Sequence, residues 1–185
     1  MKNAQEAKPQ PTIFIERISQ FRGTDLTDLC DATESTLSDD ALSFSIGLGR
    51  IDSHVRDHLE SYWKGTLLVP ERQLIIGRLD GVIASSIQLV KPSPNNQTGL
   101  FAGIVDNHFV APWARGYGLA KELLKAVETE AVAAGLSILK LSVRNNLKTA
   151  IKFYEASGYK RWGTLDKYEK MDGKFIAGYF YYKDI

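Results

Sequence analysis

The sequence has a single cysteine, almost no net charge and no long apolar run, and each of these shortages excludes a class of protein. Cys30 stands alone among 185 residues, so no disulfide framework can form, and a reducing, cytoplasmic location is expected. The 23 basic and 22 acidic side chains leave a formal net charge of +1, which argues against nucleic acid or a membrane surface as a partner. No apolar stretch is long enough to span a bilayer.

The chain also lacks the complete glycine signatures of nucleotide-binding proteins. Gly116 and Gly118 have no third glycine in the G-x-G-x-x-G register, and the next apolar strand is followed by Arg144 rather than by an acidic residue. No Gly-Lys-Ser/Thr follows the two glycines, which excludes a Walker loop. A dinucleotide or nucleoside-triphosphate site is therefore not expected in this segment.

What the chain does have is a strand, a glycine loop and a helix in direct succession. An apolar strand ends at Phe109 and Val110, and Pro112 stops its ladder. The loop that starts at Arg115 leads into a run whose apolar residues recur at helical spacing. Its glycines allow a sharp turn and close approach of a ligand, and the free N–H groups at a helix start attract anions. We expect the backbone N–H groups of residues 116–120 to bind a phosphate, with the Arg115 side chain as a further contact.

The remaining pattern predicts a mixed α/β single domain over residues 12–185, preceded by a disordered tail at residues 1–11. Strands are expected at 12–19, 73–78, 82–89, 100–110 and 138–143, and helices at 24–37, at 53–63 and on either side of the 138–143 strand. A hairpin turns at Asp80-Gly81, and a final pair of strands turns at Asp172-Gly173. The helical crossover is long enough to make the 100–110 and 138–143 strands parallel.

A second motif follows the 138–143 strand and, together with the glycine loop, resembles the GNAT family of N-acetyltransferases. The two motifs read Arg115-x-x-Gly118-x-Ala120 and Asn146-Leu-Lys-Thr-Ala150-Ile-Lys-Phe-Tyr154-Glu-Ala-Ser-Gly158-Tyr159. The first is similar to the family's pyrophosphate loop and the second to its Asn, Ala-x-x-x-Tyr, Gly-aromatic signature. One extra residue separates the asparagine from the alanine, so Asn145 and Asn146 are both candidates for the family's asparagine. The subgroup that the chain most resembles contains the tabtoxin-resistance-like acetyltransferases.

The resemblance implies a fold, a donor and a reaction. The fold is a central mixed sheet of about seven strands with four helices, in which two parallel strands splay apart and admit the cofactor's pantetheine arm. The donor is acetyl-CoA, the acetyl group passes directly to a primary amine, small molecules are the expected acceptors, and a homodimer is common in the family. The cofactor-binding residues that the resemblance implies are Phe109, Val110, Arg115, Gly116, Tyr117, Gly118, Leu119, Ala120, Asn145 and Asn146.

Candidate catalytic residues lie on the second motif and on the central strand. Tyr154 matches the family's tyrosine beside the thioester sulfur, which returns a proton to the leaving thiolate. A base must take a proton from the amine, and strict alternation places Asp106 and His108 on one strand face as alternative candidates. Ile104 stands where the subgroup often has a glutamate. If His108 is the base and has an ordinary pKa, the acidic limb of the pH–rate profile should fall at about 6.5.

The acceptor pocket is expected to form from residues 43–49 and the terminal strands. Its aromatic and acidic candidates are Tyr62, Trp63, Trp162, Tyr168, Tyr179, Glu60, Asp166 and Glu169. His54 and His58 are four residues apart on a helix, but the sequence offers no third ligand and no metal is expected. The alternative function is a catalytically inactive acyl-CoA-binding regulatory module, because the shifted asparagine and the absent strand glutamate depart from the family pattern.

Overall fold

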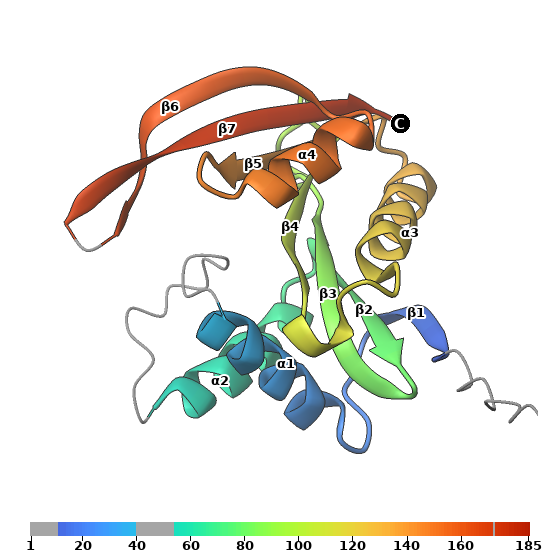
Figure 1. The fold of residues 1–185 in the computed structure, drawn as a ribbon. Coiled ribbons are helices and arrows are strands. Elements are labelled where there is room, and N and C mark those ends of the chain that lie inside the picture. The colour runs from blue at the N-terminus through green and yellow to red at the C-terminus, as the bar shows by residue number, and fades with distance from the viewer. Residues whose placement is uncertain (1–10, 40–53, 172) are drawn as a thin grey trace, which may run out of the picture.

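A computed structural model describes residues 11–39, 54–171 and 173–185, and its strands form one twisted sheet (Figure 1). The strand order is β1-β2-β3-β4-β5-β7-β6. Neighbouring strands are antiparallel except β4 and β5, which run parallel. This is the pair that the helical crossover predicts, so the mixed α/β fold is confirmed.

The elements follow the order expected from the sequence. The strands are β1 (Ile13–Ile18), β2 (Arg72–Leu79), β3 (Val82–Val90), β4 (Ala102–Val110), β5 (Ile138–Arg144), β6 (Lys160–Met171) and β7 (Lys174–Asp184). The helices are α1 (Asp25–Asp39), α2 (Val55–Leu68), α3 (Leu119–Ala133) and α4 (Lys148–Ala156), with a short 3₁₀ turn η1 (Pro112–Ala114).

Most boundaries lie within one or two residues of the sequence-based expectation, and that of α2 differs by more. Helix α2 continues past Trp63 to Leu68, and β4 starts at Ala102 because residues 97–101 form a turn that exposes Leu100 and Phe101. The tail at 1–10, the segment at 43–49 and the turn residue at 172 lie outside the described residues.

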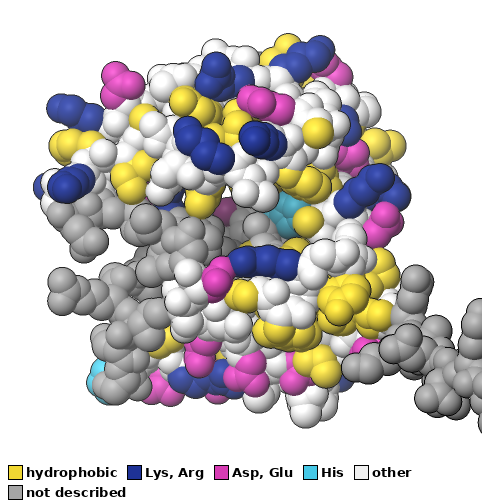
Figure 2. All heavy atoms as spheres, in the orientation of Figure 1, with side chains coloured by type: hydrophobic (Ala, Val, Ile, Leu, Met, Phe, Trp, Pro, Cys, Tyr) yellow, Lys and Arg dark blue, Asp and Glu magenta, His cyan; other side chains and the backbone are white. Residues whose placement is uncertain are grey.

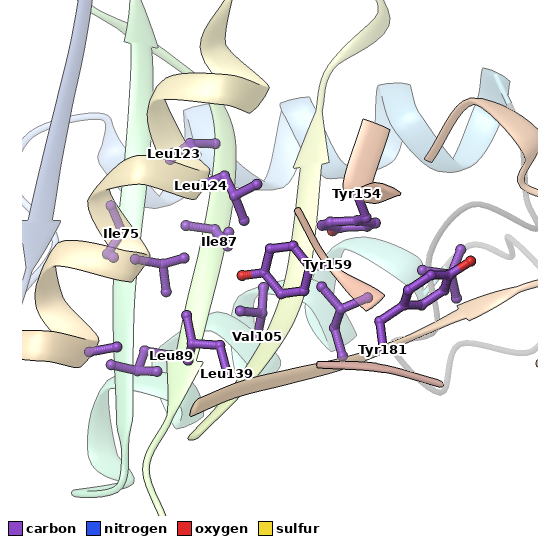
Figure 3. Packing of buried hydrophobic residues seen from close by; sticks show 14 of the residues in the cluster. Ile75, Ile87, Leu89, Val105, Leu123, Leu124, Leu139, Tyr154, Tyr159 and Tyr181 are labelled. Carbon is purple, nitrogen blue, oxygen red and sulfur yellow. The ribbon is translucent and has the colours of Figure 1, made fainter. Parts of the chain in front are cut away.

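Strand β2 shows how helices cover both faces of the N-terminal half of the sheet. Leu74, Ile75 and Ile76 are all buried, and successive side chains of a strand point to opposite faces. Ile75 packs in a cluster with Leu123 and Leu124 of α3, and Figure 3 shows these side chains meeting between helix and sheet. Leu74 and Ile76 belong to a second cluster, which contains residues of α1 and α2. We call the two sides the α3/α4 face and the α1/α2 face.

The C-terminal strands bury mainly one face. Leu141 and Val143 of β5 are buried in the cluster on the α3/α4 face, which also contains Ile151 and Tyr154 of α4. Ser142, which lies between them on the opposite face, is exposed. Among the described helices, none is both long enough and apolar enough to cross a membrane.

Candidate active site

The parallel pair of strands opens into a gap along its length. β4 and β5 pair only at Ala102, Gly103 and Ile104, although β4 continues to Val110. From residue 105 onward, the edge of β4 that faces β5 therefore has backbone groups with no strand partner among the described residues. A cavity of about 200 Å³ lies in this gap. Figure 2 shows the surface hollowed here, with a histidine side chain in the hollow.

A bulge in β4 overturns the expectation that Asp106 and His108 share a strand face. In the pairing of β3 with β4, Ile87 is the one residue opposite both Asn107 and His108. Asn107 has a φ of 46°, in the left-handed region. Because one extra residue reverses the alternation of a strand, side chains after the bulge change face.

The packing on either side of the bulge confirms the reversal. Val105 packs on the α3/α4 face and Phe109 on the α1/α2 face, although residues four apart in a regular strand share a face. Asp106 therefore lies on the α1/α2 face, while His108 contacts Tyr154 of α4 on the other side. The gap is thus lined from both faces of the sheet.

On the α3/α4 face, His108 and Tyr154 form a hydrogen-bonded pair of neutral side chains. His108 Nδ1 lies 2.9 Å from Tyr154 Oη, and the Phe153 ring packs against the imidazole. Burial lowers the pKa of His108 to about 4, an effect that the backbone of Ala120 partly opposes. Burial, followed by the nearby Asp106 charge, raises the pKa of Tyr154 well above its usual value. His108 Nε2 is buried, so Nδ1 is the ring nitrogen that contacts another side chain, Tyr154.

On the α1/α2 face, Asp106 is an arginine-paired carboxylate that solvent can reach. Its Oδ2 lies 2.9 Å from Arg72 Nη1, and its Oδ1 accepts a hydrogen bond of 2.9 Å from the backbone N–H of Asn107. The Asp106 side chain is 41% exposed. Arg72 also donates to Gln88 Oε1 at 2.6 Å, which fixes the guanidinium beside the carboxylate.

A second arginine-paired carboxylate and a fixed aromatic ring complete this face. Glu169 Oε2 lies 2.5 Å from Arg144 Nε, whose side chain is buried. The Tyr168 hydroxyl is 2.6 Å from Ser142 Oγ, and its ring lies where a side chain at Gly178 would otherwise stand. The Tyr168 ring therefore forms a wall of the gap. The cavity residues on the α1/α2 face are Ile104, Asp106, Ser142, Arg144, Tyr168 and Glu169.

The glycine loop has the form of an anion site. Gly116 and Gly118 have φ values of 88° and 89°, and Gly118 is the N-cap of α3. Among the described residues, the N–H groups of residues 116–120 donate to no backbone oxygen outside the helices and strands, as is typical of the first turn of a helix, where such groups can bind an anion. Arg115 Nη1 is 2.7 Å from Asp39 Oδ2 and both side chains are solvent-exposed.

The other predicted site residues are divided between the site and the core. Asn145 and Asn146 form the turn between β5 and α4, where the Asn145 N–H donates to Ala177 O at 2.9 Å. Trp63 is fully buried core rather than pocket wall, and Glu60 pairs with Arg56 and Lys64 on the α2 surface. The remaining aromatic and acidic candidates outside the cavity lining are Tyr62, Trp162, Tyr179 and Asp166.

Sequence reasoning missed the two arginines. Arg72 and Arg144 each end up beside a carboxylate that is distant in sequence, Asp106 and Glu169 respectively. The one available signal was the position of Arg144 at the end of a strand in which apolar and polar residues alternate. A buried arginine requires an anionic partner, so a charge at that position indicated a polar site.

Comparisons with known proteins identify a family. The profile of the Acetyltransferase (GNAT) family matches residues 37–159. A relative from Azospirillum brasilense, described as an uncharacterized N-acetyltransferase in the hisH-hisA intergenic region, is 50% identical over 132 residues, or 71% of this chain and 76% of that protein.

Solved structures share the fold at low sequence identity. A ribosomal-protein-alanine N-acetyltransferase from Brucella melitensis matches with a TM-score of 0.73 and 16% identity, covering 93% of this chain and 99% of that one. A protein from Salmonella typhimurium, solved with its cofactor acetyl-CoA, matches with a TM-score of 0.66 and 14% identity over 93% of each chain.

Proposed function

Because the chain belongs to the GNAT family of acetyltransferases, we propose that it transfers the acetyl group of acetyl-CoA directly to a primary amine of a small molecule. In this proposal, residues 12–185 act as one domain, and no covalent enzyme intermediate forms. The observation that carries the proposal is the gap between β4 and β5, which has a free strand edge and the His108–Tyr154 hydrogen bond at its wall.

Two features fit acetyl-CoA as the donor. The free edge of β4 near Phe109 and Val110 can pair with the amides of an extended pantetheine arm as a further strand would. The open N–H groups of residues 116–120, at the positive end of α3, fit its pyrophosphate, with Arg115 within the same loop. The acetyl-CoA reported for the Salmonella typhimurium structure supports the same donor.

The proton that completes the thiol is assigned to Tyr154. In the reaction a nitrogen–carbon bond forms, the carbon–sulfur bond breaks, one proton leaves the amine, and one reaches the sulfur. Burial keeps Tyr154 protonated, so its hydroxyl can donate to the leaving thiolate. The His108 imidazole, 2.9 Å from Tyr154 Oη through Nδ1, holds the phenol in position beside the gap. His108 therefore acts through Tyr154.

The proton that leaves the amine is assigned to Asp106. The carboxylate is on the face opposite Tyr154, reachable from solvent, and held in place by Arg72. His108 is less suited to this role, because its Nε2 is buried and its Nδ1 is already engaged by Tyr154. Asp106 can accept the proton directly or through one water.

The shape and charge of the α1/α2 face favour a small acceptor with a compact apolar body. Ile104 and the fixed Tyr168 ring supply apolar surface beside the opening. Asp106 and Glu169 are each neutralised by an arginine, so these two carboxylates do not attract a polycation strongly. An aromatic or aliphatic monoamine fits such a face better than a polyamine does.

The direct test is thiol release from acetyl-CoA in the presence of pooled primary amines, with the acetylated product identified by mass spectrometry. We expect amine-dependent thiol release with one or more small monoamines. Tight binding of acetyl-CoA without release for any small amine or peptide would instead support an inactive acyl-CoA-binding module. Absence of acetyl-CoA binding would contradict both functions.

A further inference from the structure

The β4 bulge places a non-glycine residue in a backbone conformation that glycine normally adopts. Among the described residues other than glycine, only Asp80 and Asn107 have a positive φ, at 50° and 46°. Asp80 lies in the β2–β3 hairpin turn, where this conformation is common. Asn107 lies inside a strand, where nothing about a regular ladder requires it. Asparagine tolerates the left-handed region better than most residues, but surrounding contacts must hold it there.

A polar network from three elements holds Asn107 in place. The Asn107 side-chain amide donates to the hydroxyl of Tyr62 on α2, and Ser86 Oγ donates to Asn107 O at 3.2 Å. Gln88 Nε2 donates to the same Tyr62 hydroxyl at 3.3 Å. Ser86 and Gln88 are fully buried, whereas Tyr62 and Asn107 are partly buried, so the network lies at the inner edge of the gap.

The Asn107 conformation decides which face His108 occupies. Without the extra residue, regular alternation would put His108 on the α1/α2 face with Asp106, away from α4. With it, His108 Nδ1 lies 2.9 Å from Tyr154 Oη. The side-chain hydrogen bond of Asn107 goes to Tyr62 and not to His108 or Tyr154, yet the pair depends on the backbone that this bond stabilises.

We propose that Asn107, locked in the left-handed conformation by Tyr62, is a positioning residue that turns His108 onto the face of Tyr154. The inference rests on the proposed function, in which the His108–Tyr154 pair delivers the proton to sulfur. The Tyr62 hydroxyl links helix α2 on one face of the sheet to the proton donor on the other.

Two substitutions at one position separate the backbone from the side chain. Asn107→Gly loses the amide but adopts a positive φ without strain, whereas Asn107→Ala loses the same amide and resists that conformation. We expect Asn107→Ala to lower kcat by about tenfold or more, with the KM for acetyl-CoA within about twofold of wild type, and Asn107→Gly to keep most of the wild-type kcat. The kcat of Tyr62→Phe should lie between those of the two Asn107 variants.

A second readout does not depend on turnover. The imidazole ¹⁵N and ¹H resonances of His108 report its hydrogen bond to Tyr154, and they should shift in Asn107→Ala while staying close to wild type in Asn107→Gly. Asp80→Ala is the matched control, because it places alanine at the other non-glycine positive φ of the described chain. It should change the melting temperature without moving the His108 resonances.

The outcomes are distinct. Unchanged His108 resonances in folded Asn107→Ala, or equal losses in folded Asn107→Gly and Asn107→Ala, would overturn the positioning role. If the wild-type protein releases no thiol, the proposed acetyltransferase function fails, yet the resonance comparison still decides whether Asn107 sets the position of His108. If Asn107→Ala does not fold, the His108 resonances are measured in Tyr62→Phe instead. Wild-type His108 resonances in that variant would contradict the role of Tyr62 in holding Asn107.

Discussion

The two faces of the gap between β4 and β5 satisfy their polar groups in opposite ways. On the α1/α2 face, Asp106 and Glu169 are charged groups, and each is paired with an arginine. On the α3/α4 face, His108 and Tyr154 are neutral and bonded to each other within an apolar cluster. Solvent reaches the first face at Asp106, whereas Tyr154 is 8% exposed.

This difference explains how one small site can accept one proton and donate another. A carboxylate that solvent can reach, and that Arg72 holds in place, is positioned to take a proton from an incoming amine. A buried phenol is suited to holding its proton until a thiolate forms beside it. The β4 bulge is what assigns Asp106 and His108 to opposite faces.

The largest expected effect comes from removing the proton donor on the α3/α4 face. Tyr154→Phe deletes one hydroxyl with little change in volume, and we expect turnover to fall by about 10²–10³-fold while acetyl-CoA affinity barely changes. Steady-state kinetics and calorimetry measure the two quantities. Tyr159→Phe is the matched control, because Tyr159 is buried in the same cluster with its ring 5.6 Å from that of Tyr154. Equal turnover in the two variants would remove Tyr154 from the chemistry.

The next effect concerns the donor alone and should leave the acceptor face untouched. Gly118→Val puts a branched side chain at a φ of 89°, beside the open N–H groups of the loop. It should weaken acetyl-CoA binding by about 1–3 kcal/mol, as calorimetry measures. Gly135→Val imposes similar backbone strain at φ 78°, beyond the other end of α3. Equal affinities for the two variants would contradict the phosphate role of the loop.

A smaller effect is expected from the carboxylate on the α1/α2 face. Asp106→Asn keeps an oxygen that can accept the Asn107 N–H but removes the proton acceptor, so turnover should fall by about tenfold with acetyl-CoA binding intact. Glu16→Gln, which breaks an arginine–carboxylate pair at the β1–β2 edge, is the control and should leave turnover unchanged. A wild-type rate in Asp106→Asn would mean that the amine arrives neutral or passes its proton to water.

The smallest expected effect on activity comes from a change in pH, which should also change the stability of the fold measurably. The folded pKa of His108 is about 4, below the value of about 6.5 expected in the unfolded chain, so the unfolded state binds more protons between these values. Stability should therefore decrease as pH falls from about 6.5 to 4, by on the order of 1–3 kcal/mol.

Chemical denaturation across this range tests the pH dependence. His108→Gln should flatten the slope of stability against pH, while His58→Gln on the exposed surface of α2 should leave it as in wild type. The same lowered pKa means that, if His108 titration limits the rate, the acidic limb of the pH–rate profile should lie at about pH 4 rather than at about pH 6.5. Identical slopes in the two variants would show that His108 is not buried in its neutral form.

The sequence was sufficient for the parts of the fold that depend on local pattern. The parallel pair follows from the crossover between β4 and β5, and the Asp80-Gly81 turn follows from local turn chemistry. The bulge was not predicted, because three successive polar residues between Val105 and Phe109 interrupt the alternation without specifying an extra residue. It depends on Tyr62, which is 45 residues away from Asn107 in the sequence.

The candidate site was predictable where a motif carries it and not where partners come from elsewhere. The glycine loop and Tyr154 lie in the expected elements, since the backbone conformation and helical spacing are local properties. The arginine partners of Asp106 and Glu169 come from distant strands, and only the folded sheet brings them together. Because each carboxylate is paired with an arginine, the α1/α2 face carries charged groups but little net charge.

The central claim is that the proton leaves the amine on one face and reaches the sulfur from the other. The most direct test uses a series of acceptor amines that differ in pKa. For each amine, the rate is divided by the concentration of its neutral form. We predict that the loss in Asp106→Asn shrinks as the amine pKa falls, because a less basic amine needs less help to lose its proton, while the loss in Tyr154→Phe stays constant across the series. A Tyr154→Phe loss that varies with amine pKa, together with a constant Asp106→Asn loss, would contradict the assignment of the two faces.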